Sequence, residues 1–432
     1  MPDDLHPDRA PRAGAAAAAD ASIEGPASWW TACATLAILS ISYGAPLIVV
    51  VGLVRVQASL MTDRSVPALA GALVWMGTGL GGMVMGRVAD RIGMRTTACF
   101  GAVMMAAGLA LSATGSVWAL YVGHGVLIGL LGNGAIYPPL VTYVSRWFDR
   151  RRGTAIALIS SGQYIAGVLW PFLFERGMAR FGWRAVMAGY GGVVLVVILP
   201  LAVVMLRDPP APVGAGHVAA GGARAGRARV LGLRPGTAQA LLCLAGFCCC
   251  VPMSIPSAHL VAYCGDIGIG AARGAMMLSV LLACAFASRQ AWGLFADRYG
   301  GLRTVMAGSA AQALAIAGFL VTRNEAGLFA VSAAFGFGFA GIIPGYVLAI
   351  RDLFPPEQAS WRVPLVLFTS MGGMAFGSWF AGALYDHFGY YAPAFGAGVL
   401  FNLANLTVVG FLVVRQGRPG GRMAGRMALA AE

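Results

Sequence analysis

Arg289 has the most informative position in this sequence, because it lies inside a long apolar stretch, residues 273–295. It stands eight positions before Asp297, which corresponds to about 12 Å along a helix. An arginine at the centre of a membrane-spanning helix costs about 2.5–3.5 kcal/mol on insertion scales, and such charges usually mark a substrate or ion path. Its planar fork of donors can hold a carboxylate through two parallel hydrogen bonds. The alternative is that the side chain extends to the nearer membrane surface.

Four further polar side chains in apolar stretches could line a site around this arginine: Tyr43, Tyr137, Tyr346 and Gln163. Each tyrosine combines an apolar ring with one hydroxyl group, which suits a small carboxylate with a short carbon tail. Pro138, Pro139 and Pro344 adjoin two of the tyrosines, so we expect the helices to bend there. Any one of the tyrosines could equally be a packing residue.

Two titratable residues, His259 and Asp266, are seven positions apart near the end of another apolar stretch. A lone histidine in an apolar helix is often only a hydrogen-bonded packing residue, although histidine titrates near neutral pH and can carry a proton. Asp266 falls where the helix should end, near one mouth of a pathway through the membrane. It is either a simple helix-end acid or a proton-coupling residue.

The composition is that of a membrane protein. Hydrophobic residues make up 58% of the 432 residues, against roughly 45–50% in an average soluble domain. All 30 basic residues are arginines, and they lie between apolar stretches rather than in one patch, so the net charge of +13 does not indicate nucleic-acid binding. The eight cysteines show no ligand spacing, and there is no glycine-rich phosphate loop or pair of catalytic carboxylates. We therefore expect no metal site, no cofactor and no enzymatic activity.

The elements that must position these side chains are twelve apolar stretches of about 20 residues or more, the length that spans a bilayer. They lie near residues 30–53, 66–88, 96–115, 118–144, 154–175, 184–206, 237–264, 273–295, 303–322, 326–350, 362–385 and 391–414. We predict an all-α membrane protein with two six-helix bundles, 29–206 and 237–415, joined by a linker at 207–236. Residues 1–28 are predicted to be a disordered tail rather than a signal peptide. Residues 416–432 are predicted to be a short tail.

The arginines predict the orientation of the chain. The side of the membrane that holds the predicted tails holds 22 of the 30 arginines, and the other side holds seven: Arg55, Arg64, Arg176, Arg180, Arg184, Arg273 and Arg323. Positively charged loops are typical of the cytoplasmic side. We therefore expect both termini in the cytoplasm and, in a bacterium, insertion in the inner membrane.

A repeated motif supports two related halves. GRVADRIGMR begins at Gly86 and GLFADRYGGLR begins at Gly293. The positions that we assign to the motif are Gly86, Asp90, Arg91, Gly93 and Arg95 in the first copy, and Gly293, Asp297, Arg298, Gly300 and Arg303 in the second. The first four pairs are each 207 residues apart. Six helices lie between the copies, so both copies face the same side, and the halves are predicted to be parallel repeats with a pathway between them.

With this motif, the chain resembles the major facilitator superfamily over almost its whole length, from about residue 29 to 415. The resemblance implies that Asp90 and Arg91 help to hold the two halves together in the outward-open state. A carboxylate near a helix N-terminus gains dipole and hydrogen-bond stabilisation, which rocking of the halves would break. The alternative is that the motif residues only form a tight turn.

Within the superfamily, three stretches are similar to the monocarboxylate transporters and the oxalate:formate antiporters. They are SRWFDRRRGTAIALISSGQ (145–163), SAHLVAYCGDIGI (257–269) and SVLLACAFASRQAWGLFADR (279–298). This resemblance implies that Arg289 anchors the substrate carboxylate and that His259 is a substrate contact or a proton carrier. The oxalate carriers have a second cation, a lysine, in the eleventh helix, whereas this sequence has no lysine. One buried charge favours a monoanion. Ala285 also departs from the acidic or amide residue of the family, which leaves coupling through that position in doubt.

The sequence therefore predicts a secondary transporter of a small, lactate- or pyruvate-like monocarboxylate, driven by a proton and working as a monomer in the lipid bilayer. A drug or metabolite exporter of the same superfamily is the first alternative, although SSGQYIAGVLWP (160–171) lacks the motif of proton-coupled drug antiporters. A sensor that has a transporter fold but does not transport is the second.

Overall fold

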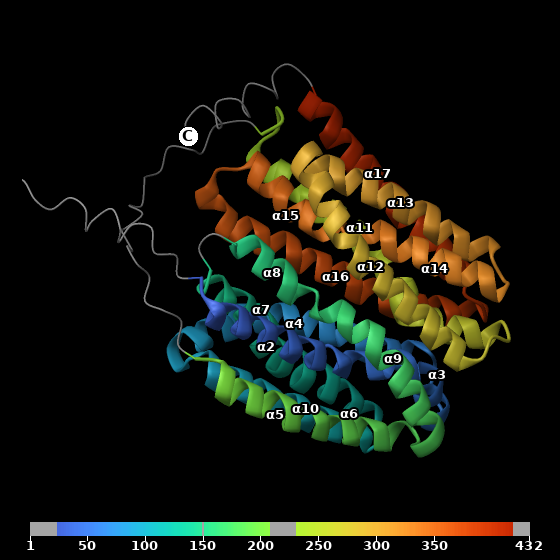
Figure 1. The fold of residues 1–432 in the computed structure, drawn as a ribbon. Coiled ribbons are helices and arrows are strands. Elements are labelled where there is room, and N and C mark those ends of the chain that lie inside the picture. Colours follow the sequence, from blue (N-terminus) through green and yellow to red (C-terminus); the bar gives the residue numbers. More distant parts are fainter. Residues whose placement is uncertain (1–23, 149–150, 208–229, 418–432) are drawn as a thin grey trace, which may run out of the picture.

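The computed structural model describes residues 24–148, 151–207 and 230–417 (Figure 1). The predicted linker and tails lie largely outside the described residues, and the limits of the two predicted domains stay predictions. The first helices along the chain are α2 (Pro26–Ser42), α3 (Gly44–Leu60), α4 (Ser65–Ile92), α5 (Met94–Ala113), α6 (Val117–Tyr121), the π-helix η1 (Val122–Asn133), α7 (Gly134–Ser145), α8 (Arg152–Ser160), α9 (Gly162–Phe181) and α10 (Trp183–Met205). They are followed by α11 (Pro235–Asp266), α12 (Ala271–Tyr299), α13 (Gly301–Val321), α14 (Glu325–Phe339), α15 (Ile342–Leu353), α16 (Pro356–Phe388) and α17 (Ala392–Gly417).

The described part of the chain contains twelve helical segments long and apolar enough to cross a membrane. Some of these spans join two consecutive helices, such as Pro26–Leu60, which contains α2 and α3, and Glu325–Leu353, which contains α14 and α15. Each of the twelve predicted apolar stretches corresponds to one span. The prediction of an all-α membrane fold with twelve transmembrane helices is confirmed.

Several spans are interrupted near their middle, and other helices satisfy the backbone groups that this frees. Between α2 and α3, the carbonyl oxygens of Ser40 and Ile41 accept hydrogen bonds from Trp170 Nε1 (2.9 Å) and the Tyr190 hydroxyl (2.6 Å). Near the break between α14 and α15, Trp292 Nε1 donates to the Phe337 carbonyl at 2.7 Å. Backbone groups in a bilayer need such partners because no water reaches them.

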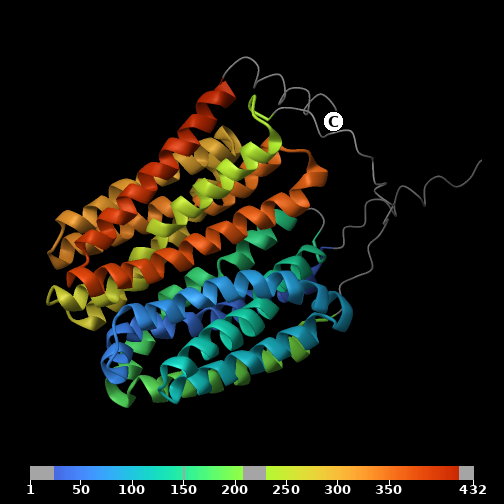
Figure 2. The ribbon, with the colours of Figure 1, turned by 180° about the vertical axis from the view of Figure 1, so that it is seen from behind.

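The helices pack as two bundles that lie side by side in both views (Figures 1 and 2). One cluster of buried side chains belongs wholly to the helices from α2 to α10, and a second belongs mainly to those from α11 to α17. The bundles touch mainly through three helix pairs, α3 with α11, α4 with α16 and α9 with α12. The pathway predicted between the halves would therefore be bordered by these helices.

Both copies of the repeated motif form a tight connection at the same end of the bundles. Gly93, between α4 and α5, has φ +84°, and Gly300, between α12 and α13, has φ +81°. Only glycine adopts such angles without strain, which explains the second glycine of each copy. We call the end that carries Asp90 and Asp297 the motif face. The opposite end, which carries Arg64 and Asp266, is called the Arg64 face.

Candidate functional site

A cavity of about 250 Å³ lies between the two bundles, where their helices meet. From the first bundle it is lined by Tyr43, Pro46, Leu47, Val50, Gly71, Trp75, Tyr137, Gln163 and Tyr164. The second bundle contributes Arg289, four serines, three methionines and other apolar residues. Arg289, Tyr43, Tyr137 and Gln163, which the sequence places in separate helices, are therefore brought to one cavity.

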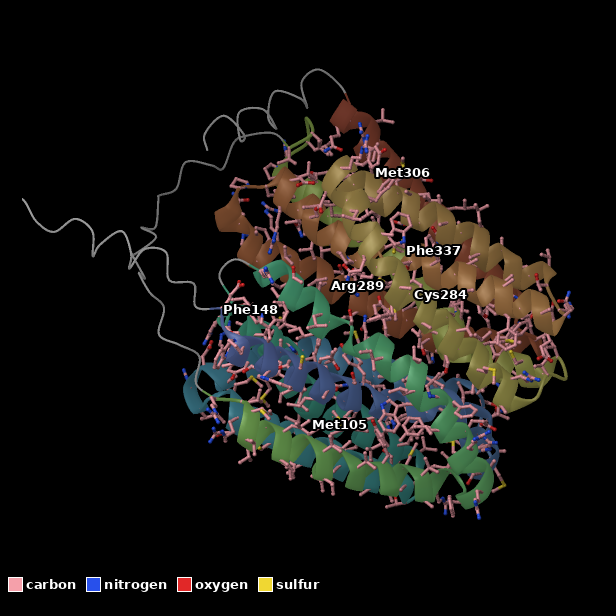
Figure 3. All side chains as sticks on the ribbon, in the orientation of Figure 1. Met105, Phe148, Cys284, Arg289, Met306 and Phe337 are labelled. Carbon is pink, nitrogen blue, oxygen red and sulfur yellow. The ribbon has the colours of Figure 1, made fainter. Side chains whose placement is uncertain are left out.

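Arg289 lies between the bundles (Figure 3) and is half-buried. One of its Nη atoms donates to the Tyr164 hydroxyl of α9 at 3.1 Å, and the guanidinium carbon lies 5.4 Å from the centre of that ring. In the part of the chain that the structure describes, no carboxylate forms an ion pair with Arg289. A guanidinium has five N–H donors. Arg289 thus presents an uncompensated positive charge to the cavity, with donors available for an anion.

The tyrosines form the wall around this charge. The rings of Tyr43 and Tyr137 meet edge to face with their centres 5.5 Å apart. Tyr164, which no sequence pattern singles out, crosses from the first bundle to Arg289 of the second. The sequence predicts its neighbour Gln163 in the site, but nothing in the spacing indicates that Tyr164 contacts a residue 125 positions away.

Tyr346 lies elsewhere, away from the predicted position in the site. It is fully buried inside the second bundle, where its hydroxyl donates to Asn405 Oδ1 at 2.8 Å. Ile343, three residues earlier in α15, lines the cavity instead. The break before α15 sets which face of that helix turns toward the cavity. The sequence does not reveal this rotation of α15 about its own axis.

His259 also lies behind the cavity wall rather than in it. It is fully buried, with Nε2 2.7 Å from the carbonyl oxygen of Ser378 and Nδ1 2.9 Å from the Tyr391 hydroxyl. A carbonyl oxygen only accepts hydrogen bonds, so Nε2 carries a proton, and in a neutral ring Nδ1 accepts from Tyr391. Ser378 lines the cavity. His259 is therefore one residue removed from any molecule bound there.

Beyond His259, a set of contacts joins the two bundles at the Arg64 face; we call it the Arg64 latch (Arg64, Ser65, Asp266, Asp386 and Tyr391). The Arg64 guanidinium donates to both oxygens of Asp266, at 2.5 and 3.1 Å, and to the Tyr391 hydroxyl at 3.3 Å. The Asp386 carboxylate accepts from the backbone N–H groups of Arg64 and Ser65, each at 2.8 Å. These groups lie at the N-terminus of α4, where a negative charge is stabilised.

The contacts of the Arg64 latch favour the charged form of the Arg64 guanidinium. Burial alone would lower the pKa of the Arg64 guanidinium, but its hydrogen bonds to Asp266 and Tyr391 raise that pKa above the usual value. The side chain of Arg64 is 6% exposed and that of Asp266 is 28% exposed. Asp266 is thus placed at the predicted helix end, but its partner 202 positions away could not be found from the sequence.

The motif residues make their contacts at the motif face within single bundles. Asp90 pairs with Arg146 of the same bundle at 2.6 Å, with both side chains about half exposed, and Arg95 Nε donates to the Leu206 carbonyl at 3.1 Å. Within the described residues, Asp297 forms no ion pair. The role of the motif in holding the halves together stays a prediction.

The hydrogen bonds that join the bundles, within the described ranges, lie at two levels: at Arg289 and at the Arg64 latch. Between Arg289 and the motif face, the described residues form no such bond. The cavity is therefore closed toward the Arg64 face, and the bundles are less firmly held toward the motif face.

Comparison with known proteins gives one family over almost the whole chain. The profile described as Major Facilitator Superfamily matches residues 29–321 and 242–426. The MFS-type transporter pynF of Aspergillus niger is 25% identical over 72% of this chain and 71% of its own length. Monocarboxylate transporter 13 of Bos taurus is 27% identical, covering 76% of each chain. Monocarboxylate transporter 11 of Homo sapiens is 28% identical over 62% of this chain, which spans only 58% of the human protein.

Solved structures agree in fold. A bacterial homologue of the human lysosomal transporter Spinster, in an inward-facing and occupied conformation, has a TM-score of 0.65 at 15% identity, covering 93% of this chain and 98% of its own. A peptide transporter, POT, in complex with sulfate has a TM-score of 0.69 at 16% identity, covering 91% of this chain and 97% of its own. At these identities the likeness concerns the fold alone.

Proposed function

This chain belongs to the major facilitator superfamily, and on that premise we propose that it is a secondary transporter that carries an organic monocarboxylate by alternating access. The observation that carries the proposal is the uncompensated guanidinium of Arg289 in the cavity between the bundles. Its donors suit a carboxylate. The similarity to proteins named monocarboxylate transporters supports the same substrate class.

The charge of the site favours a substrate with one negative charge. Arg289 is the one basic side chain among the cavity-lining residues that the structure describes. Pairing with a monoanion cancels this charge, so the occluded complex is neutral and closing the cavity around it costs less than closing it around bare arginine. A dianion would leave one negative charge without a partner. Movement of the bundles is thereby coupled to binding.

Orientation follows from the arginines. We place the motif face in the cytoplasm, because most arginines lie on that side. Both termini are then cytoplasmic, and in a bacterium the protein lies in the inner membrane. The described conformation, closed at the Arg64 face, is in this orientation closed to the outside. We propose that the protein works as a monomer, because the cavity and both gating regions belong to one chain.

The Arg64 latch offers a route for proton coupling. A proton on Asp266 removes the negative charge that neutralises Arg64, so the buried guanidinium is left with weaker partners and the bundles can separate at that face. His259 continues the network toward the cavity through Tyr391 and Ser378. We propose Asp266 as the residue that receives the proton and His259 as the group that links it to the occupied cavity.

An inward proton gradient is expected to accelerate uptake of a labelled monocarboxylate by proteoliposomes that contain the purified protein. A protonophore, which dissipates the gradient, should abolish that acceleration, and protein-free liposomes provide the control. Uptake that ignores the gradient would contradict proton coupling and favour exchange or uniport. Absence of carboxylate uptake under all conditions, with resistance of host cells to lipophilic cations, would favour the drug-exporter alternative.

The substitution Tyr164→Phe is expected to weaken carboxylate binding about three- to tenfold, because it removes the acceptor of a charge-assisted hydrogen bond that positions the guanidinium. The ring and its contact with Phe339 remain, but the hydroxyl that orients the Arg289 guanidinium is lost. Titration calorimetry on the purified protein measures the effect, and Tyr121→Phe, at a tyrosine outside the cavity, is the control. An affinity equal to that of the unmodified protein would remove Tyr164 from the site.

A further inference from the structure

We propose that the carboxylate carried by this protein has a bulky apolar tail, the size of a phenyl ring or larger, rather than the one- or two-carbon tail of a lactate-like acid. The inference rests on the proposed function, because it takes Arg289 as the anchor of the carboxylate. It departs from the sequence-based expectation of a lactate- or pyruvate-like substrate.

Arg289 is placed toward one end of the cavity. In α12, Leu282 also lines the cavity and lies seven residues nearer the Arg64 face, about 10 Å at 1.5 Å per residue. In the first span, Tyr43 and Val50 line the same cavity over another seven residues, again about 10 Å in that direction. The cavity therefore continues well beyond the anchor, toward the Arg64 latch.

The part of the cavity beyond the anchor is apolar; we call it the far chamber (Leu47, Val50, Gly71, Met253, Leu282 and Met374). Of the four serines that line the cavity, Ser254 and Ser257 already donate their hydroxyl protons, whereas Ser370 Oγ has no hydrogen-bond partner among the described residues. Ser254 donates to the Val251 carbonyl at 2.9 Å and Ser257 to the Met253 carbonyl at 2.8 Å, both within α11. The chamber thus offers mainly surface for carbon, and its methionines can adapt to the shape of a ring.

The Arg64 latch closes this chamber at its far end, so a bound tail would be enclosed. A tail of one or two carbons extends only about 3 Å past the carboxylate, at about 1.5 Å per bond. It would leave most of the 10 Å chamber to water against apolar walls, which is unfavourable. The whole cavity, about 250 Å³, is close to the lower end of the roughly 300–1,000 Å³ that holds drug-sized ligands.

The test compares acids that differ only in the tail. Acetate, lactate, phenylacetate and indole-3-acetate are titrated into the purified full-length protein by calorimetry. Each buried methylene contributes roughly fourfold in affinity, so phenylacetate is expected to bind at least tenfold more tightly than acetate or lactate. Equal affinities, or tighter binding of the short acids, would overturn the inference.

The second measurement uses a variant in which a larger side chain fills the far chamber. A Cβ atom at Gly71 would meet no atom within 4 Å, so the side chain of Gly71→Leu can start into the chamber without a backbone clash. It is expected to lower affinity for phenylacetate at least tenfold and to change affinity for acetate less than threefold. Gly192→Leu, at an exposed helical glycine in α10 with equally open surroundings, is the matched control. Equal losses for both acids in Gly71→Leu would overturn the inference.

Failure of the inference can be separated from failure of the proposed function. Binding that prefers short acids and is lost in Arg289→Ala would overturn the bulky tail and leave the carboxylate transporter standing. Binding that persists in Arg289→Ala, or binding of none of the four acids, would overturn the proposed function and the inference together.

Discussion

Replacing Arg289 with alanine is expected to abolish carboxylate uptake into proteoliposomes, a loss of at least about 100-fold, which corresponds to about 2.7 kcal/mol. Charge-assisted bidentate hydrogen bonds are the strongest that a side chain offers to a carboxylate, and no other basic residue in the described cavity wall can replace them. Uptake of a labelled monocarboxylate measures the effect. Normal uptake by Arg289→Ala would remove the anchor from the proposed mechanism.

The loss should reflect binding rather than folding. Arg289 donates one hydrogen bond to Tyr164 and has no ion pair among the described residues, so its removal leaves no buried carboxylate unpaired. Removing an intramembrane charge also relieves an insertion cost. Arg289→Lys, which keeps the charge but loses the planar fork, should be inactive too. Arg176→Ala, at an exposed arginine outside the cavity, is the matched control, and gel-filtration profiles show whether each variant is folded.

The substitution Asp266→Asn is expected to shift the protein toward a conformation that is open at the Arg64 face. Removing one partner of a buried ion pair costs about 3–5 kcal/mol, and because the Asp266 side chain is 28% exposed, the effect should fall at or below the lower figure. A shift of this size would reverse the balance between two conformations of similar free energy. Proton-driven uptake should then fall sharply, because residue 266 no longer has a carboxylate to receive the proton.

Spin-label distances across the Arg64 face provide the measurement. In a chain whose native cysteines are replaced, Met61→Cys and Arg323→Cys place one exposed label on each bundle. Their separation should increase in Asp266→Asn and stay unchanged in Asp63→Asn, a control at an exposed acid of the same face. An unaltered distance distribution in Asp266→Asn, with normal proton-driven uptake, would contradict the role of the Arg64 latch.

The sequence predicts the spans, the family and part of the site, because these depend on local patterns. Apolar stretches of about 20 residues mark the helices. The repeated motif marks the two tight connections between helices at Gly93 and Gly300. Arg289 is recognisable because a charge is costly in an apolar helix. The structure places it, with Tyr43, Tyr137 and Gln163, in one cavity.

The sequence does not predict which face of a helix turns toward the cavity. It also does not predict contacts between residues that are far apart along the chain. Tyr346 and Ile343 are one helical turn apart, yet only Ile343 reaches the cavity. Tyr164 and Arg64 contact residues 125 and 202 positions away. Neither pairing leaves a local signal, because each is created by the packing of one bundle against the other.

The uncompensated guanidinium of Arg289 also makes the empty return step of the transport cycle sensitive to membrane voltage. A bound monoanion neutralises the charge of Arg289, but a proton that travels with the anion adds one positive charge, so a complete symport cycle moves no net charge. When the empty protein returns, the bare arginine passes from one side of the electric field to the other, where a full crossing is worth about 2.3 kcal/mol per 100 mV. The membrane potential would therefore change the rate at which the empty protein returns. A substrate anion that binds before the return would neutralise Arg289 and remove this effect of the potential.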